Sequence, residues 1–297
     1  MNDAAVVPNS RRLAPTSLLA PSVAMLLLWM IVPLAMTLWF SIQHYNLLAP
    51  GRHAFAGLAN YVELLTHRAL WIAMGNTLLL LGLILATTVT FGTAFAVLLN
   101  AEFPGRQVCR SLVIAPFFVM PTVSALIWKN MLMNPVFGLF PWFTRSLGIG
   151  SIEYFSRAPL LSIVAIVSWE WVPFAVLILL PALQSLNPEQ VEAARLDGAH
   201  GFAIFRHIQL PHLLRPMVVV AMIEMIFLLS LFAEIYVTTG GGPGLASTNL
   251  AYLIFREAFF AWDVGLASAG GVLAIILANV ASLFLMRMVG RNLQDAR

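Results

Sequence analysis

Long apolar stretches alternate with short polar segments along the whole chain. Six of these stretches carry few charges or none: 18–42, 69–99, 108–131, 158–183, 217–237 and 264–288. About 20 apolar residues are enough for a helix to cross the hydrocarbon core of a bilayer. Backbone polar groups find no water there, so only helices and closed barrels can span it. The pattern predicts an all-α, polytopic membrane protein with six transmembrane helices.

The remaining segments divide the chain further. Residues 1–17 are polar and irregular and are expected to form a cytoplasmic tail, as are residues 289–297 at the other end. The apolar core of 18–42 is longer than that of a signal peptide and no convincing cleavage site follows it. We therefore expect this stretch to remain as the first helix. Residues 69–288 would then form a transmembrane domain with the other five helices.

The composition agrees with a bilayer environment, with lipid around most of the chain. The 297 residues are 60% hydrophobic and 10% charged, whereas soluble domains have about 25% charged residues. The net charge of +3 does not indicate nucleic-acid binding, because the arginines stand singly between apolar stretches and form no basic stripe. Cys109 is the single cysteine, which excludes an intrachain disulfide.

The distribution of arginines predicts the orientation, because loops on the cytoplasmic side are enriched in positive charge. With the N-terminus inside, twice as many arginines lie in the cytoplasm as outside. The inside set is Arg11, Arg12, Arg106, Arg110, Arg195, Arg206, Arg215, Arg287, Arg291 and Arg297, and the outside set is Arg52, Arg68, Arg145, Arg157 and Arg256. Both termini and the polar segment 184–216 are therefore expected in the cytoplasm.

The segment 184–216 is the longest polar interval between two apolar stretches. Asn187 can cap a helix whose first residue is Pro188, and Gly198 supplies the left-handed residue that closes it. A second short helix is expected to follow, with its apolar residues on one face, and to end at Pro211, which has no amide proton. The pattern predicts two short helices that meet at a glycine and project from the membrane.

Part of this segment resembles a known motif. Glu192-Ala193-Ala194 is followed by Gly198 and then by Ile208, Leu210 and Pro211. The order and spacing resemble the EAA loop of the membrane subunits of ABC importers, which implies their type I transmembrane fold. In that family the loop lies in a cleft of a cytoplasmic ATPase. The residues that the resemblance implies for coupling are Glu192, Ala193, Ala194, Asp197, Gly198, Phe202, Phe205, Ile208, Leu210 and Pro211.

The resemblance also implies partners and a location. It implies a dimer of a cytoplasmic ATPase, a second permease subunit that is homologous or identical, and an extracytoplasmic solute-binding protein. It places the chain in the bacterial inner membrane and leaves ATP hydrolysis to the separate ATPase, so that the chain is not itself an enzyme.

Two further segments resemble the carbohydrate branch of this family. Gly57-Leu58-Ala59-Asn60-Tyr61 is similar to a segment of sugar importers, and residues 240–252, which begin Gly240-Gly241-Gly242-Pro243-Gly244, look like the polyol importers of the sorbitol and mannitol type. The resemblance implies a sugar or a sugar alcohol as the substrate, which would pass between two permease subunits.

Polar residues within the apolar stretches are candidates for the substrate pathway. Glu170 lies near the middle of 158–183, between Trp169 and Trp171. A carboxylate facing lipid there costs about 2.5–3.5 kcal/mol, so it should face protein or water. Successive helical residues diverge by about 100°, so at most one of the two tryptophans shares its face. Asn76 and Glu224 are further candidates. Alternatively, Glu170 bonds a neighbouring helix and holds the subunit pair together.

The sequence contains no motif that indicates nucleotide binding, metal binding or catalysis. Lys129 is the single lysine and no glycine-rich GxxxxGK segment precedes it, which excludes a nucleotide-binding loop. The histidines lack metal-ligand spacing, and no cofactor or metal is expected. A secondary, ion-coupled transporter that uses Glu170, Glu224 and Glu234 is the alternative function. A membrane-embedded enzyme is the second alternative, against which the missing nucleophile motifs count.

Overall fold

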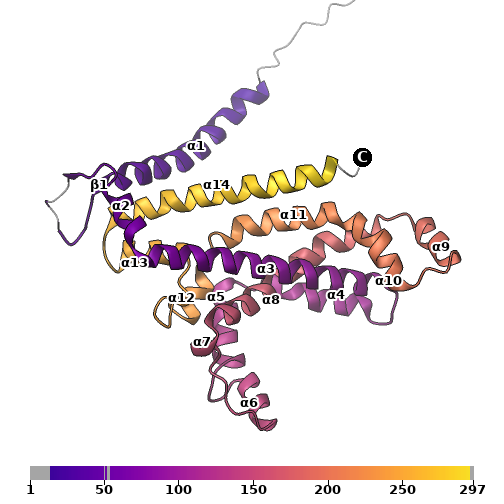
Figure 1. Cartoon of the computed structure of the whole chain (residues 1–297). Helices are drawn as coiled ribbons and strands as arrows, with labels where there is room; N and C mark the ends of the chain where they lie inside the picture. Colours follow the sequence, from indigo (N-terminus) through magenta and orange to yellow (C-terminus); the bar gives the residue numbers. More distant parts are fainter. Residues whose placement is uncertain (1–13, 50, 52–53, 295–297) are drawn as a thin grey trace, which may run out of the picture.

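The computed structural model describes residues 14–49, 51 and 54–294 and is mostly helical (Figure 1). The predicted all-α class is confirmed. Among the described residues, β structure is limited to a two-stranded antiparallel sheet of β1 (Gln43–His44) and β2 (Ala54–Phe55) and an isolated bridge between Asn46 and Asp263. Most of the predicted N-terminal tail, with Arg11 and Arg12, and the last three residues lie outside the described residues, as does Arg52.

Five long helices make up most of the molecule. Within the described residues, five helices are long and apolar enough to cross a membrane. They are α1 (Ala14–Ser41), α3 (Arg68–Asn100), α8 (Pro159–Gln184), the helix that ends with α11 (Leu210–Leu228), and α14 (Val264–Gln294). The bounds of α3 and α8 agree with the predicted stretches to within one residue. Helix α1 begins earlier than predicted, and α14 continues beyond residue 288.

The third predicted span, 108–131, is bent rather than straight, and it completes the six predicted spans if the bent pair of helices is counted as one. It consists of α4 (Arg106–Ile114) and η1 (Ala115–Phe118), then α5 (Pro121–Ile127) and η2 (Trp128–Leu132), and the two halves are bent by 106°. Met120, just before Pro121, has an extended backbone with ψ of 137°. A residue before proline is disfavoured in the helical region, which explains why the helix breaks here.

The fifth predicted span, 217–237, is also broken. Helix α11 ends at Leu228, and the separate helix α12 (Ala233–Thr238) begins after a short non-helical segment. The amide of Asn249 donates to the carbonyl of Leu231 within that segment. This bond supplies a partner for a backbone group that the break releases.

Short helices lie at the two ends and on one side of the bundle (Figure 1). Helices α2 (Ala59–Thr66) and α13 (Leu250–Phe259) lie at one end, and α6 (Leu139–Ser146) and α7 (Tyr154–Arg157) project from the side. At the other end lie α9 (Pro188–Leu196), α10 (Gly201–Ile204) and η3 (Phe205–Gln209). The start of α1 and the end of α14 point toward this same end.

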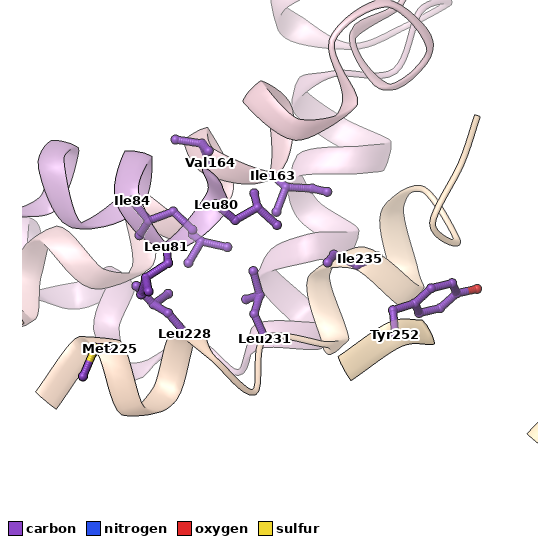
Figure 2. Packing of buried hydrophobic residues seen from close by; sticks show 11 residues of the cluster. Leu80, Leu81, Ile84, Ile163, Val164, Met225, Leu228, Leu231, Ile235 and Tyr252 are labelled. Carbon is purple, nitrogen blue, oxygen red and sulfur yellow. The ribbon is translucent and has the colours of Figure 1, made fainter. Parts of the chain in front are cut away.

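The core lies where α3, α8 and α11 meet (Figure 2). Leu80 and Ile84 of α3 face Ile163 of α8, and Met225 and Leu228 of α11 close the cluster. These side chains expose between 0 and 4% of their surface.

A second apolar cluster continues along α3 and α8 toward α9. Within it, Gly92 of α3 faces Ala175 of α8 so closely that a Cβ on Gly92 would overlap the Ala175 Cβ. Small residues let two membrane helices approach at backbone contact, where packing rather than the hydrophobic effect holds them together.

Gly92→Ala is expected to destabilise the protein, because the added methyl group overlaps Ala175 and forces α3 and α8 apart. Overpacking of this kind costs about 1–3 kcal/mol, which lowers the Tm by several degrees. Thermal unfolding of the purified protein in detergent measures the shift. Gly82→Ala is the matched control, since Gly82 is in the same helix and a Cβ there meets nothing within 4 Å.

The double substitution Gly92→Ala with Ala175→Gly moves the methyl group to the other helix and should restore most of the lost Tm. If Gly92→Ala alone proved as stable as Gly82→Ala, the close approach of α3 and α8 would not be a source of stability.

Candidate functional site

The polar segment 184–216 forms the first predicted helix as expected. Helix α9 begins at Pro188, and Asn187 Oδ1 accepts a hydrogen bond from the Glu189 N–H at 3.0 Å, which confirms Asn187 as the N-cap. Gly198 has a φ of +81°. Its N–H donates to the carbonyl of Arg195 at 3.0 Å, and the next N–H, of Ala199, donates to Ala194 at 2.9 Å. These two bonds form a Schellman motif, which fixes the end of α9.

The second predicted helix differs from expectation, because it does not end at Pro211. Helix α10, the π turn η3 and α11 follow one another without a gap, so the helix runs from Gly201 to Leu228. The Leu210 N–H donates to the Phe205 carbonyl, which is the wider spacing of a π turn. Since Pro211 has no N–H, a regular ladder is impossible here, and the π turn lies at this position. The second helix is therefore the start of a membrane helix.

The tip of this segment is exposed and partly apolar. Leu196 and Phe202 expose 90% and 74% of their surface, and the Phe202 and Phe205 rings lie 6.5 Å apart. Leu196 was not among the residues implied for coupling. Of those that were, Glu192, Ala193, Asp197, Gly198 and Pro211 are exposed like Phe202, whereas Ala194, Phe205, Ile208 and Leu210 are half-buried. Glu192, Ala193, Leu196, Asp197 and Phe202 are called the coupling surface below, after the role that the resemblance implies for four of them. Exposed apolar side chains rimmed by charged ones are typical of a protein–protein contact.

A polar cavity of about 400 Å³ lies beside the coupling surface. It is lined from α9 by Glu192 and Arg195, from the turn between α3 and α4 by Glu102, and from the start of α4 by Arg106. The sequence did not indicate that this turn lies against α9. The polar residues before Pro104 and Gly105 predict a turn at this position. They do not indicate which other segment the turn contacts.

Glu170 points into the protein rather than into an open cavity. Its side chain is 5% exposed and lies beside Ser124 of α5 and Glu234 of α12. Trp169, its neighbour, is 36% exposed and lines a cavity of about 510 Å³ between α3, α4 and α8. Trp171 packs instead against an aromatic group that includes Phe227, with ring centroids 5.2 Å apart. The three consecutive residues thus face three different surroundings.

The other two pathway candidates bond to segments within the chain. Glu224 of α11 is fully buried, and its Oε2 accepts a hydrogen bond from Thr88 of α3 at 2.6 Å. The Asn76 amide donates to the carbonyls of Leu245 and Thr248 at 3.1 and 2.9 Å. The structure therefore does not bring the five candidates together: of these, Trp169 alone lines the 510 Å³ cavity.

Two polar residues that the sequence did not single out as candidates lie in this cavity. The hydroxyls of Thr87 and Ser168 are 2.6 Å apart, and both residues line it together with Phe91 and Phe95. Threonines and serines are common in membrane helices, so their type gave no signal. Within the described residues no group of three or more His, Cys, Asp or Glu side chains is arranged to hold a metal ion.

Known proteins with similar sequences are membrane components of transporters. The chain is 35% identical to the "Probable ABC transporter permease protein y4oQ" of Sinorhizobium fredii, over 84% of this chain and 81% of that protein. It is 34% identical to the "Trehalose/maltose transport system permease protein MalF" of Thermococcus litoralis, over 94% of each chain.

A solved structure has the same fold at lower identity. A chain of the crystal structure of a bacterial ABC transporter involved in the import of the acidic polysaccharide alginate superposes with a TM-score of 0.79, at 21% identity, over 94% of this chain and 95% of that one. The predicted type I importer fold is thereby confirmed.

The family described as "Binding-protein-dependent transport system inner membrane component" matches residues 89–295, which include the coupling surface, α8, α11 and α14. The chain belongs to this family of inner-membrane permease components.

Proposed function

We propose that this chain is one permease subunit of an ATP-driven importer and that α9 and α10 dock into a separate cytoplasmic ATPase. The observation that carries the proposal is the unbroken helix from Gly201 to Leu228. It begins beside the coupling surface and ends in the core between α3 and α8. A partner that moves the coupling surface would therefore move a core helix directly.

The proposed assembly follows from what one subunit lacks. The chain has no nucleotide-binding loop, so two copies of an ATPase supply the energy. A second permease subunit, homologous or identical, completes the pathway, and an extracytoplasmic binding protein delivers the substrate. In this arrangement the coupling surface, the start of α1 and the end of α14 lie on the cytoplasmic side, in agreement with the arginine distribution.

For the substrate we propose a neutral carbohydrate, either a sugar or a polyol such as sorbitol or mannitol. The relative named for trehalose and maltose supports the carbohydrate class, and the resemblance of residues 240–252 supports a polyol. Trp169 beside the Thr87 and Ser168 hydroxyls offers an aromatic face and hydrogen-bonding groups, which suits the C–H faces and hydroxyls of such a molecule.

The other four pathway candidates contact other parts of the chain rather than the cavity beside Trp169. Glu170 and Glu224 are buried between helices, and Trp171 and Asn76 are engaged with other parts of the chain. For the two buried glutamates, contact with a substrate requires a movement of the helices that cover them, whereas Asn76 and Trp171 are half-buried.

Uptake into sealed vesicles that contain the assembled complex tests the energy source. Uptake is expected to require ATP on the coupling-surface side and to be indifferent to a protonophore, because the energy comes from hydrolysis. The reverse result, uptake without ATP that a protonophore abolishes, would support an ion-coupled transporter instead. Competition by unlabelled trehalose, maltose, sorbitol and mannitol, each tested separately, identifies the preferred substrate class.

Gly198→Val is expected to uncouple the subunit. A side chain there forces a left-handed backbone to carry a Cβ, at a cost of about 1–2 kcal/mol, although no atom lies within 4 Å of the added group. The end of α9 should shift, ATPase binding to the membranes should weaken, and uptake should fall while the protein still inserts. Co-purification of the ATPase and substrate-stimulated ATP hydrolysis are the measurements.

Gly201→Val provides the matched control, because Gly201 is exposed at the start of α10, has no left-handed backbone and has open space around its Cβ position. Gly198→Asn should keep most of the coupling, since asparagine tolerates this backbone. Equal ATPase stimulation in the Gly198→Val and Gly201→Val complexes would exclude a coupling role for the left-handed turn.

Trp169→Ala is expected to raise the KM for uptake several-fold with little effect on assembly, because it removes the aromatic face from the cavity. Trp29→Ala in α1 is the control, since that ring is 80% exposed. An unchanged KM for trehalose, maltose, sorbitol and mannitol in a fully assembled Trp169→Ala complex would remove Trp169 from the pathway.

A further inference from the structure

The turn between α13 and α14 contains a residue that does not suit its backbone conformation. Among the residues that the structure describes, ten have a positive φ, and nine of these are glycines. The tenth is Trp262, with a φ of +56°. A side chain is disfavoured in this left-handed region, whereas glycine adopts it without strain. A position that favours glycine is therefore occupied by a large aromatic side chain.

The surrounding backbone holds this turn in one conformation. The Trp262 carbonyl accepts a hydrogen bond from the Leu47 N–H at 2.9 Å, and the Asp263 N–H donates to the Glu257 carbonyl at 3.0 Å. The Asn46 amide donates to the Asp263 carboxylate at 3.3 Å. Backbone strain persists only where the surrounding structure fixes it, and it is concentrated at binding and active sites. The fixed turn leaves the Trp262 side chain 44% exposed.

Two more aromatic side chains are exposed just before Trp262. Phe259 and Phe260 expose 61% and 62% of their surface, and these three residues are called the aromatic turn below. The Phe259 and Phe260 rings both lie against Phe255, with centroid distances of 4.9 and 5.8 Å. Phe255 in turn lies 4.7 Å from Phe232, which directly precedes α12. The aromatic turn therefore rests, through Phe255, on the break that follows α11.

The aromatic turn lies at the end of the bundle opposite to the coupling surface, where α13 ends and α14 begins (Figure 1). The charged side chains beside it are engaged within the chain. Arg256 pairs with Glu257 at 3.5 Å, and the Asp263 carboxylate accepts the Leu266 N–H at 2.8 Å. The face that the aromatic turn presents is therefore apolar rather than charged.

We propose that the aromatic turn is a docking surface for the extracytoplasmic solute-binding protein and that Trp262 enters an apolar pocket of that partner. The inference rests on the proposed function, in which this end of the bundle faces outward. Tryptophan is enriched among the residues that dominate the binding energy of protein interfaces, and a ring that is held in place beforehand loses little freedom on binding. A lipid surface accepts aromatic rings in many orientations, so it does not explain a strained backbone at Trp262.

ATP hydrolysis by the assembled complex in lipid nanodiscs, titrated with its binding protein, tests the proposal. The binding protein is loaded with whichever of trehalose, maltose, sorbitol and mannitol raises its own Tm. Trp262→Gly is expected to raise the half-saturating concentration of the binding protein by about tenfold or more, because the anchoring ring is lost. Trp262→Phe keeps a ring and should raise it less. Trp29→Ala in α1 removes another exposed tryptophan and should leave it unchanged.

The Tm of the purified chain separates docking from local packing. Trp262→Gly should keep or raise the Tm, because glycine relieves the strained backbone. Trp262→Asn also removes the ring and tolerates this backbone, so it tests the same point if glycine lowers the Tm by loosening the unfolded chain. A Tm that falls by several degrees in both variants, with an unchanged half-saturating concentration, would show that the ring only packs locally and would overturn the proposal.

Two other results would place the ring elsewhere and would also overturn the proposal. The fluorescence of Trp262, taken as the difference between the native and Trp262→Gly chains, should not be quenched by brominated lipid, because quenching would indicate a lipid surface. The Trp262→Gly subunit should still co-purify with the second permease subunit, since loss of that subunit would indicate a contact between permeases.

Failure of the docking surface can be distinguished from failure of the proposed function. If the loaded binding protein stimulates the native and Trp262→Gly complexes at the same concentration, the docking surface alone is wrong. If it does not stimulate the native complex, the proposed function is wrong, and the docking surface with it.

Discussion

Backbone groups that are released where a membrane helix breaks must find partners within the chain, because the bilayer offers none. Asn249 meets this requirement by donating to the Leu231 carbonyl at the break after α11. Asn76 and Thr77 of α3 meet it on the neighbouring segment: Asn76 donates to carbonyls of residues 245–248, and Thr77 Oγ1 accepts the N–H of Leu250 at 2.9 Å. The polar residues inside an apolar helix therefore allow an irregular segment to pack against it.

Helix α3 combines this polar role with a close approach to α8. Along one face, Gly92 admits Ala175 of α8 at backbone contact, and the leucines and isoleucines nearby fill the core. Along the same helix, Thr88 bonds the buried carboxyl of Glu224 from α11. A uniformly apolar helix could supply the packing, but it would leave Glu224 and the segment after α12 without partners. Burial of a polar group without a partner costs about 1–3 kcal/mol, so these few positions determine which arrangement is stable.

Local chemistry explains which features could be predicted from the sequence. The straight helices follow from hydropathy, and the ends of α9 follow from the side chain of Asn187 and the backbone of Gly198. Hydropathy does not detect the 106° bend, although Pro121 marks its place, because the bent halves are as apolar as a straight span. The prediction that the second short helix ends at Pro211 was wrong, because a π turn lets the helix continue past this residue. Glu170 of α8 lies beside Glu234 of α12 because α12 packs against α8. The spacing of these two residues along the sequence does not indicate this packing.

The continuous helix and the broken segments that follow it are expected to respond differently to a displacement. From the coupling surface inward, the helix from Gly201 to Leu228 is unbroken, and at about 1.5 Å per residue it extends roughly 40 Å. Beyond Leu228 the chain turns through a non-helical segment into α12, close to the bend that precedes α5. A rigid helix transmits displacement along its axis, whereas a break absorbs it by changing a few backbone angles. A displacement of the Gly201 end of this helix would therefore be carried along the helix to the core, where α5, α8 and α12 pack against one another.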